Sequence, residues 1–301
     1  MRVNPDYVSD LVSSLNQVTA NEQTITEEIS TGVTVNSLSD NPAAAGQNVL
    51  LSAQLNAVDT FSQTASSVES MLQVGDSALG NVITQLTSAI SLATEANNGT
   101  LSASNEQSIA IQLTGVRDEV LSLANSSYMG QYVFAGSQGG TIPFTIDTTT
   151  SPATVTYSGD TDVSYVGTPT GQQIQTNIPG SQIFTAAGAN NVLGALNDLI
   201  ADYSSGSPSA TSASDLENLN TALNYVSQQR VILDDSITRL TAAGNYSSSE
   251  ATQLASAQDS LIQTNMAQAA SQLSSAETQQ ASLTQVIAAI DNQGNLFNYL
   301  Q

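Results

Sequence analysis

The sequence predicts a mainly α-helical fold with a β insert: a long antiparallel coiled coil or helical bundle built from both chain ends, plus a small central β domain. Two observations lead to this prediction. Apolar residues recur at alternating spacings of three and four near both ends of the 301-residue chain, which is typical of amphipathic helices. Between them, a stretch rich in Gly, Thr, Val, Tyr and Pro carries short alternating runs, which are typical of β-strands.

The first predicted helix carries a narrow apolar seam and ends at a glycine. Its seam positions are Val8, Leu11, Leu15, Val18, Ile25 and Ile29. This is the a/d pattern of a coiled coil, interrupted by the polar Glu22. Gly32 supplies the residue that most readily takes the left-handed conformation after a helix.

Two more helices are expected before residue 131. Pro42 suits the first position of a helix that continues to about Asn97. A helix of that extent is about 80 Å long and must lie along other helices. Ser104 and Gln107 form a capping box for the third helix, which ends near Gly130.

The middle of the chain predicts strands and then a return to helices. The expected strands are Tyr132–Phe134, Phe144–Ile146, Ala153–Tyr157 and Val163–Val166. A short helix is expected over 190–203, and the serine-rich run 204–209 has the composition of a flexible linker.

Two further helices complete the pattern. Ser214 and Glu217 form a capping box, and Gly244 is expected to stop that helix. Ser247 and Glu250 are expected to cap the last helix, whose seam contains the polar Gln280. The apolar seam residues chosen from this helix and the tail are Leu273, Leu283, Ile287, Ile290, Phe297 and Leu300.

Because the β insert lies near the centre, the simplest packing folds the chain back and sets the first helix beside the last. We therefore expect five segments: an N-terminal coiled-coil helix (1–40), the first part of a helical bundle (41–130), a β-rich insert (131–189), the second part of the bundle (190–260) and a C-terminal coiled-coil helix (261–301).

Composition excludes most catalytic chemistry. The chain has 26 acidic and 4 basic residues, a net charge of −22, and no lysine, histidine or cysteine. It therefore lacks the residues of a Ser-His-Asp triad, a thiol nucleophile or a conventional zinc site. Aromatic residues are only 5% and tryptophan is absent, which argues against a sugar-cleaving cleft. We expect no enzyme, and no catalytic, cofactor or metal site; at Asp160, turn chemistry is a better interpretation than a calcium loop.

The same charge balance excludes two kinds of partner. Nucleic acid and anionic lipid both require clustered Lys and Arg, so neither is expected. The first residues turn polar at once instead of forming a secretory signal, and the apolar runs are too short to span a bilayer, so no membrane insertion is expected.

The terminal seams are too narrow to bury much surface in a two-helix pair. A globular core needs a wider apolar face than an a/d stripe, and isolated helices are marginal without packing. The two ends therefore look incomplete until neighbours surround them, which indicates an assembling subunit. Glu22 and Gln280 are interpreted either as register-setting groups or as residues tolerated on a partly solvated seam. Arg230, also on a seam, either pairs with Asp234 or Asp235 or keeps its head in water.

Residues 30–46 read STGVTVNSLSDNPAAAG, which resembles the N-terminal signature of the bacterial flagellin superfamily. Two further stretches resemble its hook-associated protein 3 branch, the hook–filament junction proteins. The first is YMGQYVFAGS at 128–137 with Pro143-Phe144, and the second is YSGD at 157–160 with NIPG at 177–180 and Phe184. The ending NLFNYL at 295–300 resembles the family's C-terminus. Two positions depart from the pattern: Val33-Thr34 stand where basic residues are usual, and Thr264-Asn265 replace an acidic pair.

This resemblance implies a structural role in the extracellular flagellum. It implies export through the flagellar type III apparatus, which explains the lack of a signal peptide, and a ring of a few copies between hook and filament. Implied partners are hook-associated protein 1, flagellin, other copies of the chain and an export chaperone. The seam and tail residues named above are then the expected subunit interface.

Two alternatives remain open from the sequence. The first is flagellin itself, which polymerises without limit instead of stopping at a ring. The second is a coiled-coil surface stalk or adhesin, which would form a stable oligomer in dilute solution and bind carbohydrate or a receptor through its β insert.

Overall fold

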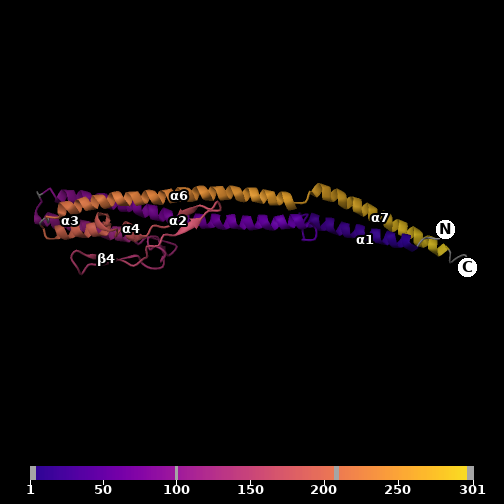
Figure 1. The fold of residues 1–301 in the computed structure, drawn as a ribbon, viewed down its shortest axis with the longest axis horizontal. Coiled ribbons are helices and arrows are strands. Elements are labelled where there is room, and N and C mark those ends of the chain that lie inside the picture. Colours follow the sequence, from indigo (N-terminus) through magenta and orange to yellow (C-terminus); the bar gives the residue numbers. More distant parts are fainter. Residues whose placement is uncertain (1–4, 99–100, 207–209, 297–301) are drawn as a thin grey trace. The chain divides into compact units, whose positions relative to one another are not determined.

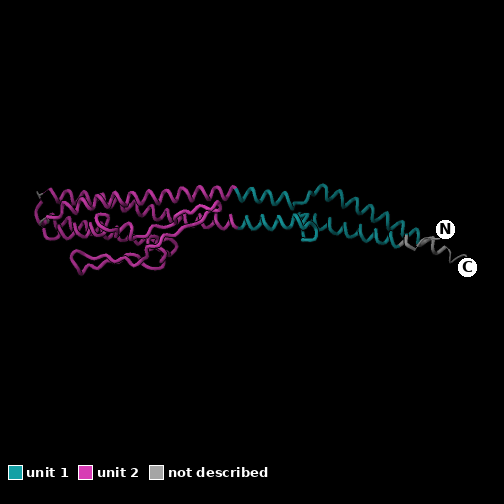
Figure 2. Tube along the Cα trace, in the orientation of Figure 1, with its two compact units in different colours: residues 1–56, 250–301 teal, residues 57–249 magenta. Residues whose placement is uncertain are grey.

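The computed structural model describes residues 5–98, 101–206 and 210–296, and it is mostly helical (Figure 1). The chain forms two compact units (Figure 2). Unit 1 combines residues 1–56 with 250–301, and unit 2 comprises residues 57–249. Both chain ends therefore belong to the same unit. The five-segment division expected from the sequence remains a prediction.

Unit 1 is built on two helices from opposite ends of the sequence. Helices α1 (Pro5–Thr31) and α7 (Met266–Leu296) pack side by side, as the indigo and yellow ribbons of Figure 1 show. Gly32, which follows α1, has φ of +73°, the left-handed conformation expected at a helix end. The predicted pairing of the first and last helices is confirmed.

Two very long helices, α2 (Pro42–Ala96) and α6 (Ser212–Ile262), run through both units. Within unit 2, polar contacts join them: Arg230 donates to Asp76 at 2.7 and 3.0 Å, and the Thr241 hydroxyl lies 3.1 Å from Glu69. Of the two readings left open for Arg230, the one that paired it with Asp234 or Asp235 had the wrong partner, whereas its side chain does remain 42% exposed. The two oxygens of the Asp76 carboxylate accept one hydrogen bond each from the Arg230 guanidinium, and such a bidentate ion pair is stronger than a single hydrogen bond.

The remaining elements of unit 2 pack against these helices. Helix α3 (Ala103–Ala124) lies against α5 (Val192–Ser204), and α4 (Gly180–Ile183) and a short 3-10 helix (Gly188–Asn190) precede α5. The core is aliphatic and aromatic. Its largest fully buried side chains are Tyr203, Phe134, Phe144, Phe184, Leu72, Leu79, Leu86, Leu113, Ile174, Ile183, Leu193 and Leu196.

The β insert consists of antiparallel hairpins. In the described residues, the pairs are β1 (Ser127–Tyr128) with β2 (Gln131–Tyr132), β3 (Phe144–Asp147) with β4 (Thr154–Tyr157), and β5 (Tyr165–Gly167) with β6 (Gln173–Gln175). The predicted β insert is confirmed, although β1 and β6 were not predicted. Val133 and Phe134, expected in a strand, are instead buried beyond the end of β2.

Several predicted helix boundaries were wrong. Helix α3 ends at Ala124 and not near Gly130, α6 begins at Ser212 so that the expected cap Ser214 lies inside it, and α7 begins at Met266 and not at Ser247. Helix α3 is capped by Ser102, whose hydroxyl accepts from the Asn105 N–H at 3.4 Å, and not by Ser104. Helix α6 passes through Gly244 and the buried Ser247 to Ile262. A glycine inside a helix costs only about 1 kcal/mol relative to alanine, which the packing of a 51-residue helix overrides.

Gly244→Ala is therefore expected to stabilise the protein by about 0.5 to 1 kcal/mol, because a Cβ at this position meets no atom within 4 Å. Thermal unfolding followed by circular dichroism measures this as a small rise in Tm. A lower Tm would mean that residue 244 is a helix end after all.

Candidate functional site

The predicted interface residues within the described helices lie on α1 and α7, which pack against each other. Ile25 is buried. The partly buried members are Leu11, Leu15, Val18, Ile29, Leu273, Leu283, Ile287 and Ile290. The side chain of Val8, together with Phe297 and Leu300, lies outside what the structure describes. The pair thus covers much of its own apolar seam but leaves most seam residues accessible.

Two alanines that the sequence places on the seam of the last helix were left out of the predicted interface set. Ala269 and Ala276 are 3% and 7% exposed and are the most buried described side chains of α7. Their positions continue the 3-4 spacing of Leu273 and Leu283, so the signal was present.

Two polar residues interrupt the seam. The Gln280 amide nitrogen donates to the Thr19 hydroxyl at 3.3 Å, so this seam residue links α7 to α1 within the chain. Glu22 has one carboxylate oxygen that is buried and has no hydrogen-bond partner among the described residues. Both side chains line a groove of about 520 Å³ beside the seam. A second groove, of about 470 Å³, is lined by Ile25, Glu28 and Ala276 among others. The two-helix pair therefore leaves accessible hollows along its length.

The loop after α1 is hydrogen-bonded to the residues between α6 and α7, within unit 1. The Thr34 N–H and hydroxyl donate to the Ile262 carbonyl at 2.7 and 2.9 Å, and the Thr264 N–H donates to the Gly32 carbonyl at 2.9 Å. These bonds tie the segment that contains Val33-Thr34 to the segment that contains Thr264-Asn265.

Asp40 organises the rest of this loop. Its carboxylate accepts from the N–H groups of Asn36 and Ser37 at 3.1 and 2.7 Å and from the Ser37 hydroxyl at 2.7 Å. These bonds, above all that from the Ser37 hydroxyl, lower the pKa of Asp40. Asn41 then caps α2 by accepting from the Ala44 N–H at 3.1 Å. The 30–46 motif is thus a loop that anchors the break before α7 and starts α2.

The mid-chain motifs meet in one aromatic cluster. The rings of Phe134 and Phe144 each contact Phe184 edge to face, with centroids 5.3 Å apart. The Tyr157 hydroxyl lies 3.0 Å from the Phe134 carbonyl and 2.7 Å from the Asp160 carbonyl. These residues hold the hairpins onto the helices, so the motifs encode packing.

Asp160 also serves as a turn residue. Its carboxylate accepts from the N–H groups of Ser137 at 2.7 Å and Asp162 at 3.1 Å, and its pKa is lowered chiefly by the Ser137 hydroxyl. Across the described residues, the acidic side chains form no group of three or more that could hold a metal ion.

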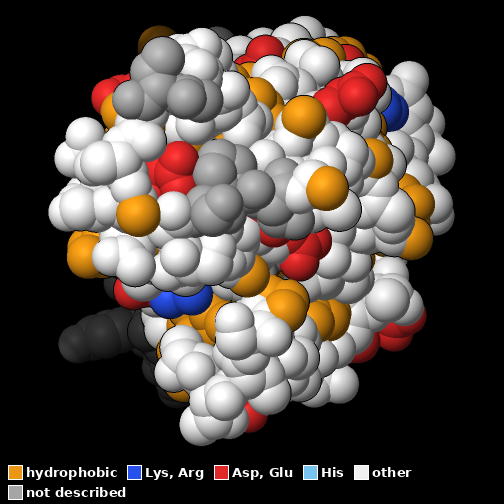
Figure 3. Space-filling view, turned by 90° about the vertical axis from the view of Figure 1, so that its left-hand side faces the viewer, with side chains coloured by type: hydrophobic (Ala, Val, Ile, Leu, Met, Phe, Trp, Pro, Cys, Tyr) orange, Lys and Arg blue, Asp and Glu red, His pale blue; other side chains and the backbone are white. Residues whose placement is uncertain are grey.

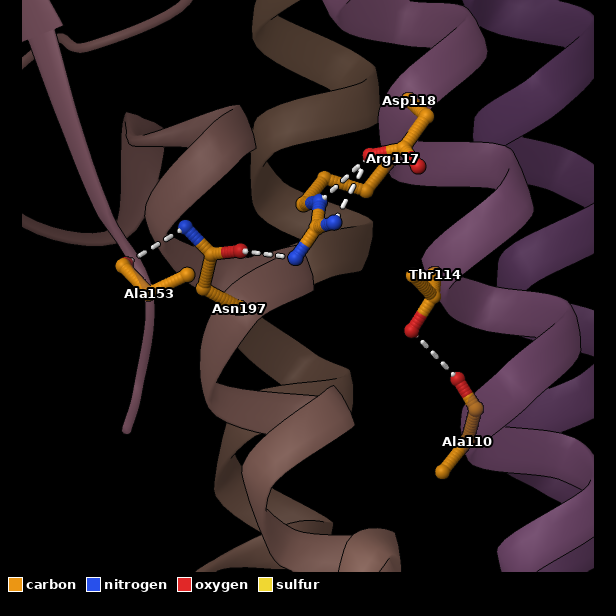
Figure 4. Close-up of polar contacts among 6 residues, drawn as sticks. All are labelled: Ala110, Thr114, Arg117, Asp118, Ala153 and Asn197. Carbon is orange, nitrogen blue, oxygen red and sulfur yellow. Dashed lines mark hydrogen bonds and ion pairs between the residues drawn. The ribbon is translucent and has the colours of Figure 1, made fainter. Parts of the chain in front are cut away.

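A buried arginine, which the sequence analysis missed, joins α3 to α5. Arg117 is 5% exposed and donates to Asp118 at 3.0 and 2.7 Å and to the Asn197 side-chain oxygen at 3.4 Å (Figure 4). Asn197 in turn donates to the Ala153 carbonyl at 2.9 Å, just before β4. The hydrogen bonds of this network are all made to other groups of the protein, so we interpret the network as structural.

Comparison with known proteins identifies the family. The profile of the bacterial flagellin N-terminal helical region matches residues 8–139. Flagellar hook-associated protein 3 of Escherichia coli is 30% identical over 243 residues, which are 75% of this chain and 76% of that protein. The chain belongs to the flagellar hook-associated protein 3 family.

Other relatives agree with this placement. The hook-associated protein 3 of Salmonella typhimurium is 35% identical over 119 residues, 39% of this chain and 38% of that protein. In fold, the chain resembles a flagellar hook-associated protein of Vibrio parahaemolyticus (TM-score 0.64, 19% identity, 74% of this chain and 100% of that one). It also resembles hook-associated protein 3 of Legionella pneumophila (TM-score 0.61, 13% identity, 70% and 98%).

Family membership settles the broad role. The chain is a structural component of the bacterial flagellum, outside the cell, and it assembles with other flagellar axial proteins. It is not an enzyme. None of its described helices is both long and apolar enough to span a bilayer.

Proposed function

We propose that this chain forms a ring that joins the hook to the filament, with hook-associated protein 1 on one side and flagellin on the other. Export through the type III apparatus, with a chaperone holding the C-terminal helix, belongs to the same proposal. The observation that supports it most is the half-covered seam of α1 and α7, in which Ile25, at 8% exposure, is the only buried one of the predicted seam residues whose side chains the structure describes.

The proposed subunit interface is the seam and tail set. Its residues are Val8, Leu11, Leu15, Val18, Ile25, Ile29, Leu273, Leu283, Ile287, Ile290, Phe297 and Leu300. Apolar area removed from water contributes roughly 25 cal/mol per Å², and the seam leaves such area exposed in a single chain. Neighbouring axial subunits would cover that area and fill the two grooves beside the seam.

Flagellin is the second candidate function. Flagellin A of Vibrio anguillarum is 30% identical over 126 residues, although these cover only 33% of that protein. The two functions differ in copy number, because a filament subunit polymerises without limit and a junction subunit stops at a ring.

Deletion of the gene separates the candidates. We expect a strain without this chain to secrete unpolymerised flagellin into the medium, detectable by immunoblotting, and to carry hooks without filaments. Restoring the gene should restore filaments. If the chain were flagellin, the deletion would abolish filaments and leave no flagellin in the medium. Normal filaments in the deletion strain would exclude both functions and favour a surface stalk.

A further inference from the structure

An arginine lines a small pocket on unit 2, between helix α6 and the turn that joins β5 to β6. The pocket has a volume of about 200 Å³. Helix α6 contributes four lining residues, which are Arg239, Ala242, Ala243 and Tyr246, and the turn contributes Thr168 and its neighbours. The lining therefore combines apolar surface with a single charged group, a composition typical of small-molecule sites.

Hydrogen bonds within the turn give its side of the pocket a fixed shape. The Thr168 N–H donates to the Gln172 carbonyl at 2.8 Å, and the Gln172 N–H donates to the Thr168 hydroxyl at 3.0 Å. Gly171 has φ of +84°, and its N–H donates to the Thr168 carbonyl at 2.9 Å. Thr168 itself is only 8% exposed. Because this side of the pocket is already ordered, a ligand can bind there without a large loss of conformational entropy.

The Arg239 guanidinium is held at this pocket but is only loosely paired. One of its terminal nitrogens donates to the Gln173 carbonyl of β6 at 3.2 Å. The other lies 3.9 Å from the Asp235 carboxylate, which is too far for a hydrogen bond, and the two side chains are 46% and 66% exposed. A guanidinium has more N–H donors than these contacts use, and its planar fork matches the two oxygens of a carboxylate. Arg239 is thus positioned to bind a carboxylate that enters the pocket.

The size and the lining of the pocket determine the rest of the ligand. Its volume of about 200 Å³ is below the roughly 300 Å³ at which pockets for drug-sized ligands begin, so it admits only a small molecule. Pro169, Ala242 and Ala243 offer apolar contact. Tyr246, which is 55% exposed, offers an aromatic ring against which a second ring can pack. A small aromatic acid makes all of these contacts at once.

Charge argues against an acidic macromolecule at the same place. The chain carries a net charge of −22, and acidic side chains are spread over the surface seen in Figure 3, where basic ones are few. An acidic protein would bring many carboxylates against such a surface, and like charges repel each other. A small acid carries a single charge, which Arg239 neutralises locally. The charge balance therefore favours a small monocarboxylate over an acidic partner protein.

We propose that this pocket binds a small aromatic monocarboxylate, with the carboxylate on Arg239 and the ring against Tyr246 and the two alanines. Asp235 then competes with the ligand for the same guanidinium. The site belongs to a single chain and does not depend on the proposed ring, so it is tested on the purified protein.

Benzoate, titrated into the purified full chain and followed by ligand-detected NMR, tests the site. We expect saturable binding with a Kd of about 1 mM, as suits so small a ligand. Benzyl alcohol has a similar size but no charge, and it should bind about tenfold more weakly because it forms no charge-assisted hydrogen bonds. Arg239→Gln should raise the Kd of benzoate about tenfold. Ala242→Leu, at an exposed position, should have a similar effect by filling the pocket.

A pair of aspartate variants distinguishes this site from a general effect of charge. Asp235→Asn removes the carboxylate that competes for Arg239 and should lower the Kd of benzoate about threefold. Asp234→Asn makes the same change of charge at an exposed residue that does not line the pocket, and it should leave the Kd unchanged. Circular dichroism checks that each variant is folded.

Each of four results would overturn the proposal. The first is the absence of saturable benzoate binding, and the second is equal affinity for benzyl alcohol. The third is an unchanged Kd in the folded Arg239→Gln or Ala242→Leu variant. The fourth is an equal effect of Asp234→Asn and Asp235→Asn, because binding would then follow the net charge of the chain and not the guanidinium of Arg239.

Discussion

Leu15→Asp and Leu283→Asp will each leave unit 2 folded and abolish swimming. Both leucines are partly buried in the seam of α1 and α7, within unit 1. Because each leucine is only partly buried, an aspartate there loses apolar contact worth about 1 kcal/mol, and it places a charge against an apolar neighbour. A two-helix pair has little packing to offset that loss. Motility on soft agar measures the effect, and circular dichroism of the purified variants checks the fold of the rest.

Matched controls lie one residue before each leucine. Ser14 and Ser282 are exposed on the same two helices, so Ser14→Asp and Ser282→Asp add the same charge outside the seam. These variants should swim. Normal swimming by Leu15→Asp or Leu283→Asp would show that the seam is not required for assembly, and the proposed interface would be wrong.

Gly180→Ala will destabilise unit 2 by about 2 to 3 kcal/mol, in the range expected for overpacking. A Cβ at this position would lie 2.6 Å from the Phe144 ring and 2.9 Å from the Phe134 carbonyl. Neither atom has room to retreat, since Phe144 and Phe134 are both 1% exposed and packed against Phe184. The Gly180 N–H also donates to the Phe134 carbonyl at 2.8 Å, a bond that any shift would weaken.

Thermal unfolding measures this loss as a fall in Tm of several degrees. The same substitution at Gly46, where a Cβ meets nothing within 4 Å, serves as the control and should leave Tm unchanged or slightly raised. An unaltered Tm for Gly180→Ala would mean that the aromatic cluster is loosely packed, contrary to the structure.

The pairing of the chain ends was predictable because it depends on side-chain periodicity. Seam residues such as Leu15 and Leu283 repeat at helical spacing, and that spacing is a local property of the sequence. The β insert was recognisable for the same reason, from alternation around Phe144 and Tyr157.

What the sequence could not show depends on partners far along the chain. Gly244 resembles a helix end locally, whereas the true break follows Ile262, whose carbonyl accepts from Thr34, 228 residues away. Arg117 has no local feature that marks it as buried, because its contact with Asn197 needs α5 to be in place. The Asp76 partner of Arg230 was missed because it lies 154 residues away.

The bonds between the loop at Gly32–Thr34 and the break at Ile262–Thr264 also bear on the order in which the chain acquires structure. Closing a loop of more than two hundred free residues has a large entropic cost before any contact repays it. Most of that separation is the chain of unit 2, which contains its own core. Once unit 2 has folded, the entropic cost of closing this loop no longer opposes the pairing of the two chain ends. Refolding should therefore proceed from the inside outward, with the extremities joining last and, in heat, parting first.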